Sequence, residues 1–223
     1  MSPLHPSPDA PTAMRPESVG TDRDAGELGM WVFIASEMLF FGGLLLAYGW
    51  ARAYDPSGFA QASRHTNVLI GTINTALLLS SSLLLALAAL AAQDDATRRA
   101  RFCRDLLAGA ALIGLLFLVL KGVEYRMEWR EHLVPGADFF AAEAEPPLRG
   151  AALFFAFYFI ATGLHAIHVM AGVLWLGMLG LAFHRRKIWA DGTRTHIVGL
   201  YWHFVDAVWV LLYPLLYLVD RHP

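Results

Sequence analysis

Five long apolar segments constrain this chain more than any other feature. They run from Leu28 to about Ala51, Val68 to about Ala92, Leu106 to about Met127, Gly150 to about Phe183 and Gly199 to about Val219. An α-helix needs ~20 apolar residues to cross the ~30 Å hydrocarbon layer of a membrane. Only 16% of the residues are charged, against about 25% in soluble domains. The sequence therefore predicts an all-α, polytopic membrane bundle with five transmembrane helices.

Residues 1–27 precede the first apolar segment and form a polar tail with several prolines. The tail lacks the basic-then-apolar layout of a cleavable signal peptide, and we expect it to be disordered and cytoplasmic. Residues 28–223 form the one predicted domain, the five-helix transmembrane unit. The net charge of −2, without a basic patch, gives no case for nucleic-acid binding.

The distribution of arginine and lysine predicts the orientation of the bundle. The short segments 93–104 and 184–198 fall on the same side as the tail and are rich in basic residues. Basic residues accumulate in the cytoplasmic loops of membrane proteins. We therefore expect the N-terminus to be cytoplasmic and the C-terminus periplasmic.

Polar residues at helical spacing lie inside several of the apolar segments. The last segment carries Trp202, Asp206, Trp209 and Tyr213 on one stripe, and His203 lies three residues before Asp206, within hydrogen-bond reach. Because polar groups are expensive in hydrocarbon, we expect them to face other helices. The predicted interhelical hydrogen-bonding residues are Asn74, Thr162, His165, His168, His203 and Asp206.

Three charged residues inside the spans allow two interpretations each. Lys121 and Glu124 are an i, i+3 pair, which predicts either a mutually neutralising ion pair or a contact with lipid headgroups. Glu37 is either a proton carrier or a hydrogen-bonded carboxyl group that fixes helix packing. The sequence leaves these interpretations open.

Motifs for catalysis and metal binding are missing from the sequence. It has no nucleophile motif, phosphate-binding glycine loop or His-Glu metallohydrolase spacing, and its single Cys103 excludes an internal disulfide. His165 and His203 could in principle supply the axial ligands of a haem, although histidines bonded to hydroxyl or carboxylate groups explain the same residues. We predict no catalytic residue and no metal ligand in this chain.

Five groups of motifs follow one another along the chain. They are Gly29-Met30 with Ser36-Glu37-Met38-Leu39-Phe40-Phe41, Asn74-Thr75-Ala76-Leu77-Leu78-Leu79-Ser80-Ser81, Glu124-Tyr125, Ala161-Thr162-Gly163-Leu164-His165-Ala166-Ile167-His168-Val169, and Tyr201-Trp202-His203-Phe204-Val205-Asp206-Ala207-Val208-Trp209. In this order the chain resembles subunit III of the haem–copper oxidases, in the short five-helix bacterial form. The resemblance extends from about Gly29 to Tyr217.

This resemblance implies a non-catalytic subunit of an aa3-type cytochrome c oxidase, the oxidoreductase and translocase that ends the aerobic electron transport chain. Such a complex lies in the bacterial inner (plasma) membrane, where it reduces O₂ to water and pumps protons across the membrane. Haem a and copper belong to the partner subunits, and this chain would bind none of them. It would pack mainly on subunit I, beside subunit II, hold phospholipid and support proton uptake. Glu37 matches the family's buried glutamate.

Some features depart from the family pattern or leave alternatives open. Many members have two further helices that border the lipid cleft, and some have a basic residue where this chain has Glu27. The equivalent subunit of a quinol oxidase or of a nitric oxide reductase system is an alternative, because the chain lacks the electron-donor site. A stand-alone transporter or b-type cytochrome is an alternative of a different class.

Overall fold

The computed structural model describes residues 16–91, 97–136, 149–185 and 192–219, and every regular element in them is helical. In chain order these are α1 (Pro16–Tyr54), α2 (Pro56–Ser63), α3 (Val68–Ala91), α4 (Thr97–Arg130), α5 (Arg149–His184), α6 (Gly192–Tyr213) and the short π-helix η2 (Pro214–Leu218). Among them are five segments long and apolar enough to cross a membrane: Asp24–Tyr54, Val68–Ala91, Arg101–Arg130, Gly150–His184 and Gly192–Leu218. The predicted all-α, five-span membrane fold is confirmed.

Three helices begin earlier in the chain than the apolar pattern predicts. Helices α1, α4 and α6 begin at Pro16, Thr97 and Gly192, so polar residues continue each helix beyond its apolar part. Adding a residue to an existing helix requires far less free energy than nucleating one. Residues 16–27 are therefore helical where the sequence predicted a disordered tail, and residues 1–15 lie outside the described residues.

The last span changes its helix type at Pro214. Proline has no N–H group to donate to the carbonyl oxygen four residues earlier. The backbone passes there from the α-helix α6 into η2, whose hydrogen bonds span five residues. This wider turn brings Leu216 and Tyr217 into the core, where both are buried.

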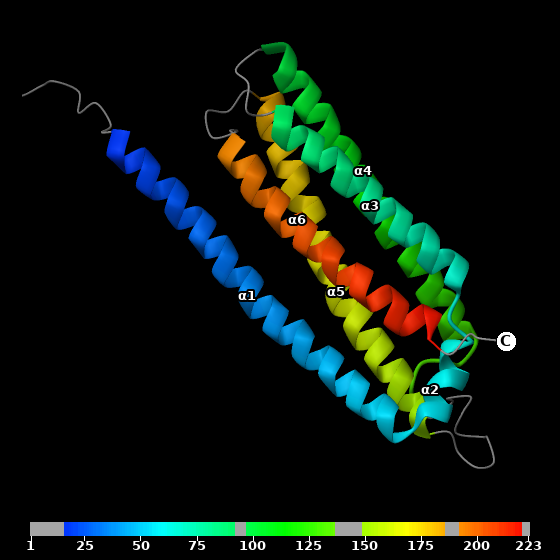
Figure 1. Cartoon of the computed structure of the whole chain (residues 1–223). Coiled ribbons are helices and arrows are strands. Elements are labelled where there is room, and N and C mark those ends of the chain that lie inside the picture. The colour runs from blue at the N-terminus through cyan, green and yellow to red at the C-terminus, as the bar shows by residue number, and fades with distance from the viewer. Residues whose placement is uncertain (1–15, 92–96, 137–148, 186–191, 220–223) are drawn as a thin grey trace, which may run out of the picture.

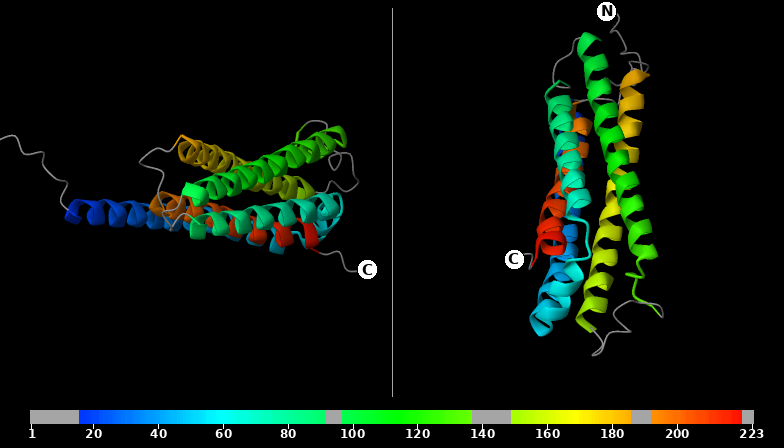
Figure 2. Two further views of the ribbon diagram at one scale, coloured as in Figure 1. Left: turned by 90° about the horizontal axis from the view of Figure 1, so that it is seen from above. Right: turned by 90° about the vertical axis from the view of Figure 1, so that its right-hand side faces the viewer.

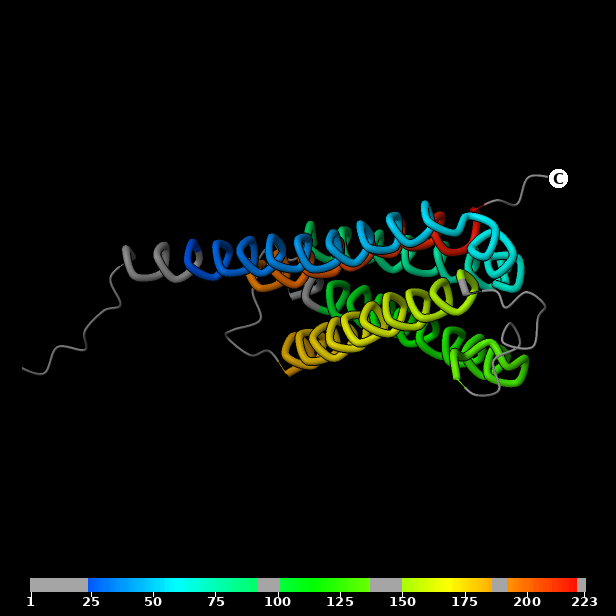
Figure 3. Tube along the Cα trace, turned by 90° about the horizontal axis from the view of Figure 1, so that it is seen from below, coloured from blue at the N-terminus to red at the C-terminus, as the bar shows by residue number. Residues whose placement is uncertain are grey.

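The helices pack in two layers, which Figure 1 shows face-on and the left view of Figure 2 shows edge-on. Helices α1, α6 and α3 lie side by side in one layer, and α4 and α5 cover its inner face (Figures 2 and 3). Helix α6 contacts α1, α3 and α5. Its span has the largest buried share of the five, 56% against 17% for the span of α1.

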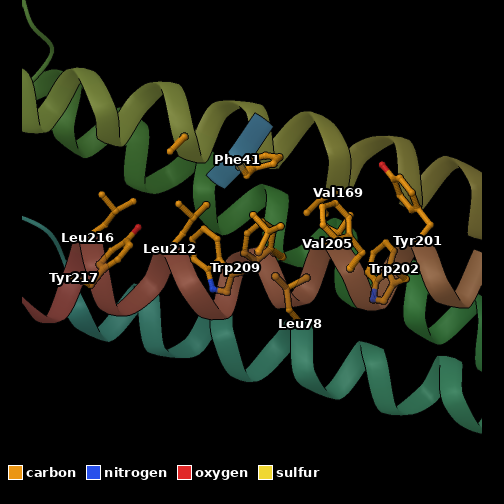
Figure 4. Packing of buried hydrophobic residues seen from close by; sticks show 14 of the residues in the cluster. Phe41, Leu78, Val169, Tyr201, Trp202, Val205, Trp209, Leu212, Leu216 and Tyr217 are labelled. Carbon is orange, nitrogen blue, oxygen red and sulfur yellow. The ribbon is translucent and has the colours of Figure 1, made fainter. Parts of the chain in front are cut away.

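The core of the bundle is organised around tryptophans of α6, which point from α6 into the bundle in Figure 4. Trp202 is 0% exposed and fits between two glycines, Gly114 of α4 and Gly172 of α5. A Cβ atom on either glycine would lie 2.7 Å from the indole ring. Small residues thus let two neighbouring helices approach a large ring closely, as is common in membrane bundles.

Asp55 joins three helices outside the membrane spans. Its Oδ1 atom accepts hydrogen bonds from the Gly58 N–H at 3.0 Å and the Ser57 hydroxyl at 2.9 Å, which caps α2. Its Oδ2 atom accepts one from the Gly150 N–H of α5 at 3.0 Å. The Gly58 and Ser57 hydrogen bonds have the largest effects and hold the pKa of Asp55 below its usual value. Desolvation opposes them, and the Gly150 hydrogen bond lowers the pKa by a smaller amount.

We expect Asp55→Ala to lower the free energy of unfolding by about 0.5–2 kcal/mol, the usual range for a lost helix cap. Because the folded pKa is depressed, the carboxylate stabilises the fold fully above its unfolded pKa of about 4 and loses this effect as the pH falls through the lower folded value. The thermal midpoint should therefore differ between wild type and variant at neutral pH and converge in acid. Asp105→Ala is the control, since that exposed carboxylate bonds its neighbour Arg104; a loss as large in the control would contradict the assignment.

Candidate functional site: polar groups between the spans

Lys121 of α4 has its ammonium group enclosed by three oxygen atoms. Its Nζ atom donates to Glu124 Oε2 at 2.9 Å and to the hydroxyl groups of Tyr158 and Tyr217 at 2.7 Å each. The centroid of the Tyr158 ring lies 4.4 Å from Nζ and adds a cation–π contact. All three ammonium hydrogens therefore have acceptors, and one charged group connects α4, α5 and η2.

Burial distinguishes between the two interpretations of Lys121 and Glu124. Both side chains are 2% exposed, so neither reaches a lipid headgroup. Mutual neutralisation, supported by two tyrosine hydroxyl groups, is how this pair is accommodated inside the bundle. The placement favours a structural ion pair.

The sequence reasoning missed two members of this cluster, Glu128 and Tyr217. Glu128 is 4% exposed and interacts electrostatically with Lys121. The sequence could have predicted Glu128, because it lies seven residues after Lys121 and so on the same helix face as Lys121 and Glu124. Tyr217 continues the α6 stripe four residues beyond Tyr213, but the π-helical turn at Pro214 that carries it inward was not predictable from spacing.

Thr162 provides a second hydrogen-bonded connection between α4 and α5. Its hydroxyl donates to the Tyr158 carbonyl oxygen at 2.7 Å and lies 2.6 Å from the Tyr125 hydroxyl. Since the threonine proton is already engaged, Tyr125 is the donor in the second bond. Thr162 thus makes the interhelical hydrogen bond that its sequence position suggested.

Glu37 of α1 faces His168 of α5, with Glu37 Oε2 and His168 Nε2 3.3 Å apart and both side chains about one fifth exposed, at 20% and 19%. His168 Nδ1 lies 2.8 Å from the Leu164 carbonyl oxygen, which can only accept, so Nδ1 carries a proton. The contact between Nε2 and Glu37 is then favourable when one further proton lies on either group. The geometry describes a close carboxyl–imidazole pair between α1 and α5.

His203 and Asp206 do not form the hydrogen bond that their spacing suggested. His203 is exposed, and its Nδ1 atom lies 2.6 Å from the Ser82 hydroxyl of α3. Asp206 is 4% exposed, and neither of its carboxyl oxygens has a hydrogen-bond partner among the described residues. Residues three apart lie on neighbouring positions of one helix face, yet His203 is exposed and Asp206 is buried.

Asn74 and His165 are buried at 0% and 1% exposure, and their polar atoms have no hydrogen-bond partner in the described part of the chain. The His165 ring lies 5.7 Å from the Phe117 ring and 5.1 Å from the Trp209 ring, measured between centroids. Trp209 in turn donates from Nε1 to Thr75 Oγ1 at 3.0 Å. The predicted hydrogen bonds of Asn74 and His165 are thus not formed within these residues.

This packing does not fit a haem held by His165 and His203. Two aromatic rings cover the buried imidazole of His165, whereas His203 is exposed and bonded to Ser82. The described ranges also contain no group of three or more His, Cys, Asp or Glu residues placed to hold a metal ion. Lys121, Thr162, His168 and His203 contact side chains of other helices, whereas Asn74, His165 and Asp206 have no hydrogen-bond partner among the described residues.

Comparison with known families gives one match over most of the chain. The sequence model of the family described as "Cytochrome c oxidase subunit III" matches residues 20–220. The match includes all five spans and every motif on which the resemblance rested.

Three similar proteins illustrate the range of relatives. A "Cytochrome c oxidase subunit 3" of Thermostichus vulcanus is 31% identical over 94% of this chain and 95% of its own length. A "Heme-copper oxidase subunit I+III" of Aeropyrum pernix is 30% identical over 88% of this chain, which spans 23% of that longer protein. A "Cytochrome bo(3) ubiquinol oxidase subunit 3" of Pseudomonas aeruginosa is 29% identical over 86% of this chain and 83% of its own length.

Proposed function

Because the chain belongs to the cytochrome c oxidase subunit III family, we propose that it is the non-catalytic subunit III of a proton-pumping terminal oxidase of the aa3 type. In this function, haem a and copper lie in partner subunits, and the complex as a whole is the oxidoreductase that reduces O₂ to water. The chain is a multi-pass membrane protein. We place it in the bacterial plasma membrane with its N-terminus in the cytoplasm.

The proposed non-catalytic function rests on the hydrogen bonds of the buried Lys121, which all go to residues of this chain. Lys121, the most enclosed cation among the described residues, donates one hydrogen bond to Glu124 on its own helix and one each to Tyr158 and Tyr217 on α5 and η2. A buried charge with all its partners supplied by the same chain has no free position for a substrate. The polar groups therefore support a subunit that stabilises a larger neighbour.

The partner that we assign first is subunit I. The relative from Aeropyrum pernix is named as subunits I and III together, and this chain matches 23% of it. Two proteins that occur fused in one organism are often partners when separate in another. We propose that subunit I is the main contact and that subunit II lies in the same complex.

A quinol oxidase is the second candidate complex, because one relative is named as a subunit of a ubiquinol oxidase. The two complexes differ in their electron donor, which partner subunits bind. Turnover of the purified complex with reduced cytochrome c and with ubiquinol distinguishes them. We expect cytochrome c to support the faster rate.

We propose the Glu37 and His168 pair as the proton-related site. A carboxyl group beside an imidazole nitrogen can exchange a proton with it with little rearrangement, which suits support of proton uptake. We expect Glu37→Gln to leave assembly intact, because the amide keeps the shape and the hydrogen-bonding capacity. Recovery of subunit III with tagged subunit I is the measurement, with Ser36→Ala as a neighbouring control, and absence of the Gln variant from the complex would contradict the prediction.

A cavity between α5 and α6 is our candidate for the phospholipid site. It has a volume of about 350 Å³ and is lined by Trp175, Met178, Leu179, Ile197, Val198 and Arg194. The apolar residues suit an acyl chain, and Arg194, near the beginning of α6, suits a headgroup phosphate. Mass spectrometry of lipid retained by wild type and by Val198→Trp, which fills the cavity, tests this assignment; equal retention would oppose it.

The proposed complex is tested by purifying the tagged chain from its native membrane. We expect a coloured complex that contains subunits I and II and consumes O₂. A colourless chain that purifies alone from membranes with active oxidase would overturn the proposed function.

A further inference from the structure

Two polar pairs line the outer side of the seam between α3 and α6. Ser82 pairs with His203 at 2.6 Å, and Thr72 pairs with Tyr213 at 2.6 Å, and both pairs are exposed. This seam belongs to the layer of α1, α6 and α3, on the side away from α4 and α5 (Figures 2 and 3). His203 lies near the middle of the Gly192–Leu218 span, so its depth corresponds to the interior of the bilayer.

The imidazole of His203 has hydrogen-bonding capacity left over. Its Nδ1 atom is engaged with Ser82, and Nε2 has no hydrogen bond to any residue in the described ranges. A neutral imidazole presents one donor and one acceptor, so Nε2 requires a partner of its own. A lipid tail offers none, and ionisable groups in membrane spans accordingly face protein or water.

Both layers expose apolar side chains, including Leu83 of α3 and Leu211 of α6, and the exposed imidazole of His203 is what distinguishes the α6 face. At comparable depth, α4 exposes Leu112, Leu116 and Val119, and α5 exposes Ile167 and Met170. Such apolar side chains can face lipid tails, because they need no hydrogen-bond partner. On α6, Ala207 follows His203 at i+4 and is also exposed, so a small residue beside the imidazole leaves room for a neighbouring helix to approach.

We propose that the outer face of α6 around His203 and Ala207 is the docking surface for a transmembrane helix of the catalytic subunit I, which supplies a hydrogen-bonding side chain to His203 Nε2. This inference rests on the proposed function and adds to it the face that carries the contact. Ser82 is a positioning residue, since its hydroxyl holds the imidazole with Nε2 outward. The apolar α4 and α5 layer faces lipid.

Photocrosslinking in the intact complex tests which face meets subunit I. A benzoylphenylalanine residue would replace Ala207 in one variant, and Leu116 or Ile167 in two controls of similar depth and exposure. We expect a crosslink to subunit I from position 207 and none from positions 116 and 167. A crosslink to subunit I from a control position only, a crosslink between two copies of this chain at position 207, or a complex without a protein crosslink at 207 would each overturn the proposal.

Substitutions at His203 test the hydrogen bond itself. We expect His203→Leu to raise the rate at which subunit III leaves the detergent-solubilised complex by about three- to tenfold, as for loss of one hydrogen bond between membrane helices. His203→Gln should restore retention, because its amide can still bond. Ser82→Ala removes the hydrogen bond that positions the imidazole but keeps the imidazole, so we expect a smaller loss of retention than for His203→Leu. Retention of His203→Leu equal to that of wild type would overturn the docking surface. A tagged chain that recovers no oxidase subunit at all would instead overturn the proposed function on which this surface rests.

Discussion

Replacing Lys121 by methionine should be the most damaging single change to a charged residue in this chain, with a loss of about 3–5 kcal/mol in the free energy of unfolding. This is the usual penalty when one member of a buried ion pair is removed and the other remains. Glu124 would remain 2% exposed without its cation, and the hydroxyl groups of Tyr158 and Tyr217 would lose a shared donor. The variant should show a lower thermal midpoint in the purified complex and reduced recovery of subunit III.

A double-variant cycle separates the charge from the packing of the lysine side chain. In Lys121→Met with Glu124→Gln, no uncompensated charge remains, so we expect the double variant to be more stable than Lys121→Met alone. Arg126→Met is the control for removal of a cation, because Arg126 is exposed on the same helix. A thermal midpoint of Lys121→Met equal to that of the control would contradict the structural importance of the cluster.

Truncation of Trp202 to alanine should cost about 3–5 kcal/mol through the cavity that it leaves. The ring is fully buried between Gly114 and Gly172, and neither glycine has a side chain that could move into the space. Trp50→Ala is the matched control, since Trp50 is 82% exposed. Thermal unfolding of the three proteins should rank wild type and Trp50→Ala together and Trp202→Ala well below them.

The converse substitutions probe the same contact. Gly114→Val or Gly172→Val would place atoms inside the van der Waals radius of the Trp202 ring, and overpacking of this kind typically costs about 1–3 kcal/mol. Combining Gly172→Val with Trp202→Ala should recover part of the loss, because the new side chain enters the cavity. A double variant whose loss equals the sum of the two single losses would show that the ring and the glycine do not share one contact.

Apolar periodicity and length predicted the five spans because both follow from the thickness of the hydrocarbon layer. The residues at which α1, α4 and α6 begin were less predictable, since polar residues extend these helices at their N-terminal ends. Spacing also identified the face of α4 that carries Lys121 and Glu124. It could not show that tyrosines of α5 and η2 complete this cluster, because partners on other helices depend on packing.

His203 illustrates what spacing alone cannot decide. Its separation of three residues from Asp206 fits either a contact within α6 or two different neighbours. In the structure the imidazole turns to Ser82, which is remote in sequence, while Asp206 turns inward. Glu37 and His168 are a similar case, because their contact joins α1 and α5 and depends on how these helices pack.

Haem absorption, measured after subunit III is separated from the purified complex, tests whether this chain binds a pigment. We propose that the charged and imidazole groups of this chain hold helices together and bind no pigment. All haem absorbance should then remain with the other subunits, while the separated chain is colourless and retains its helical circular dichroism. Haem that travels with the folded, separated chain would contradict the account.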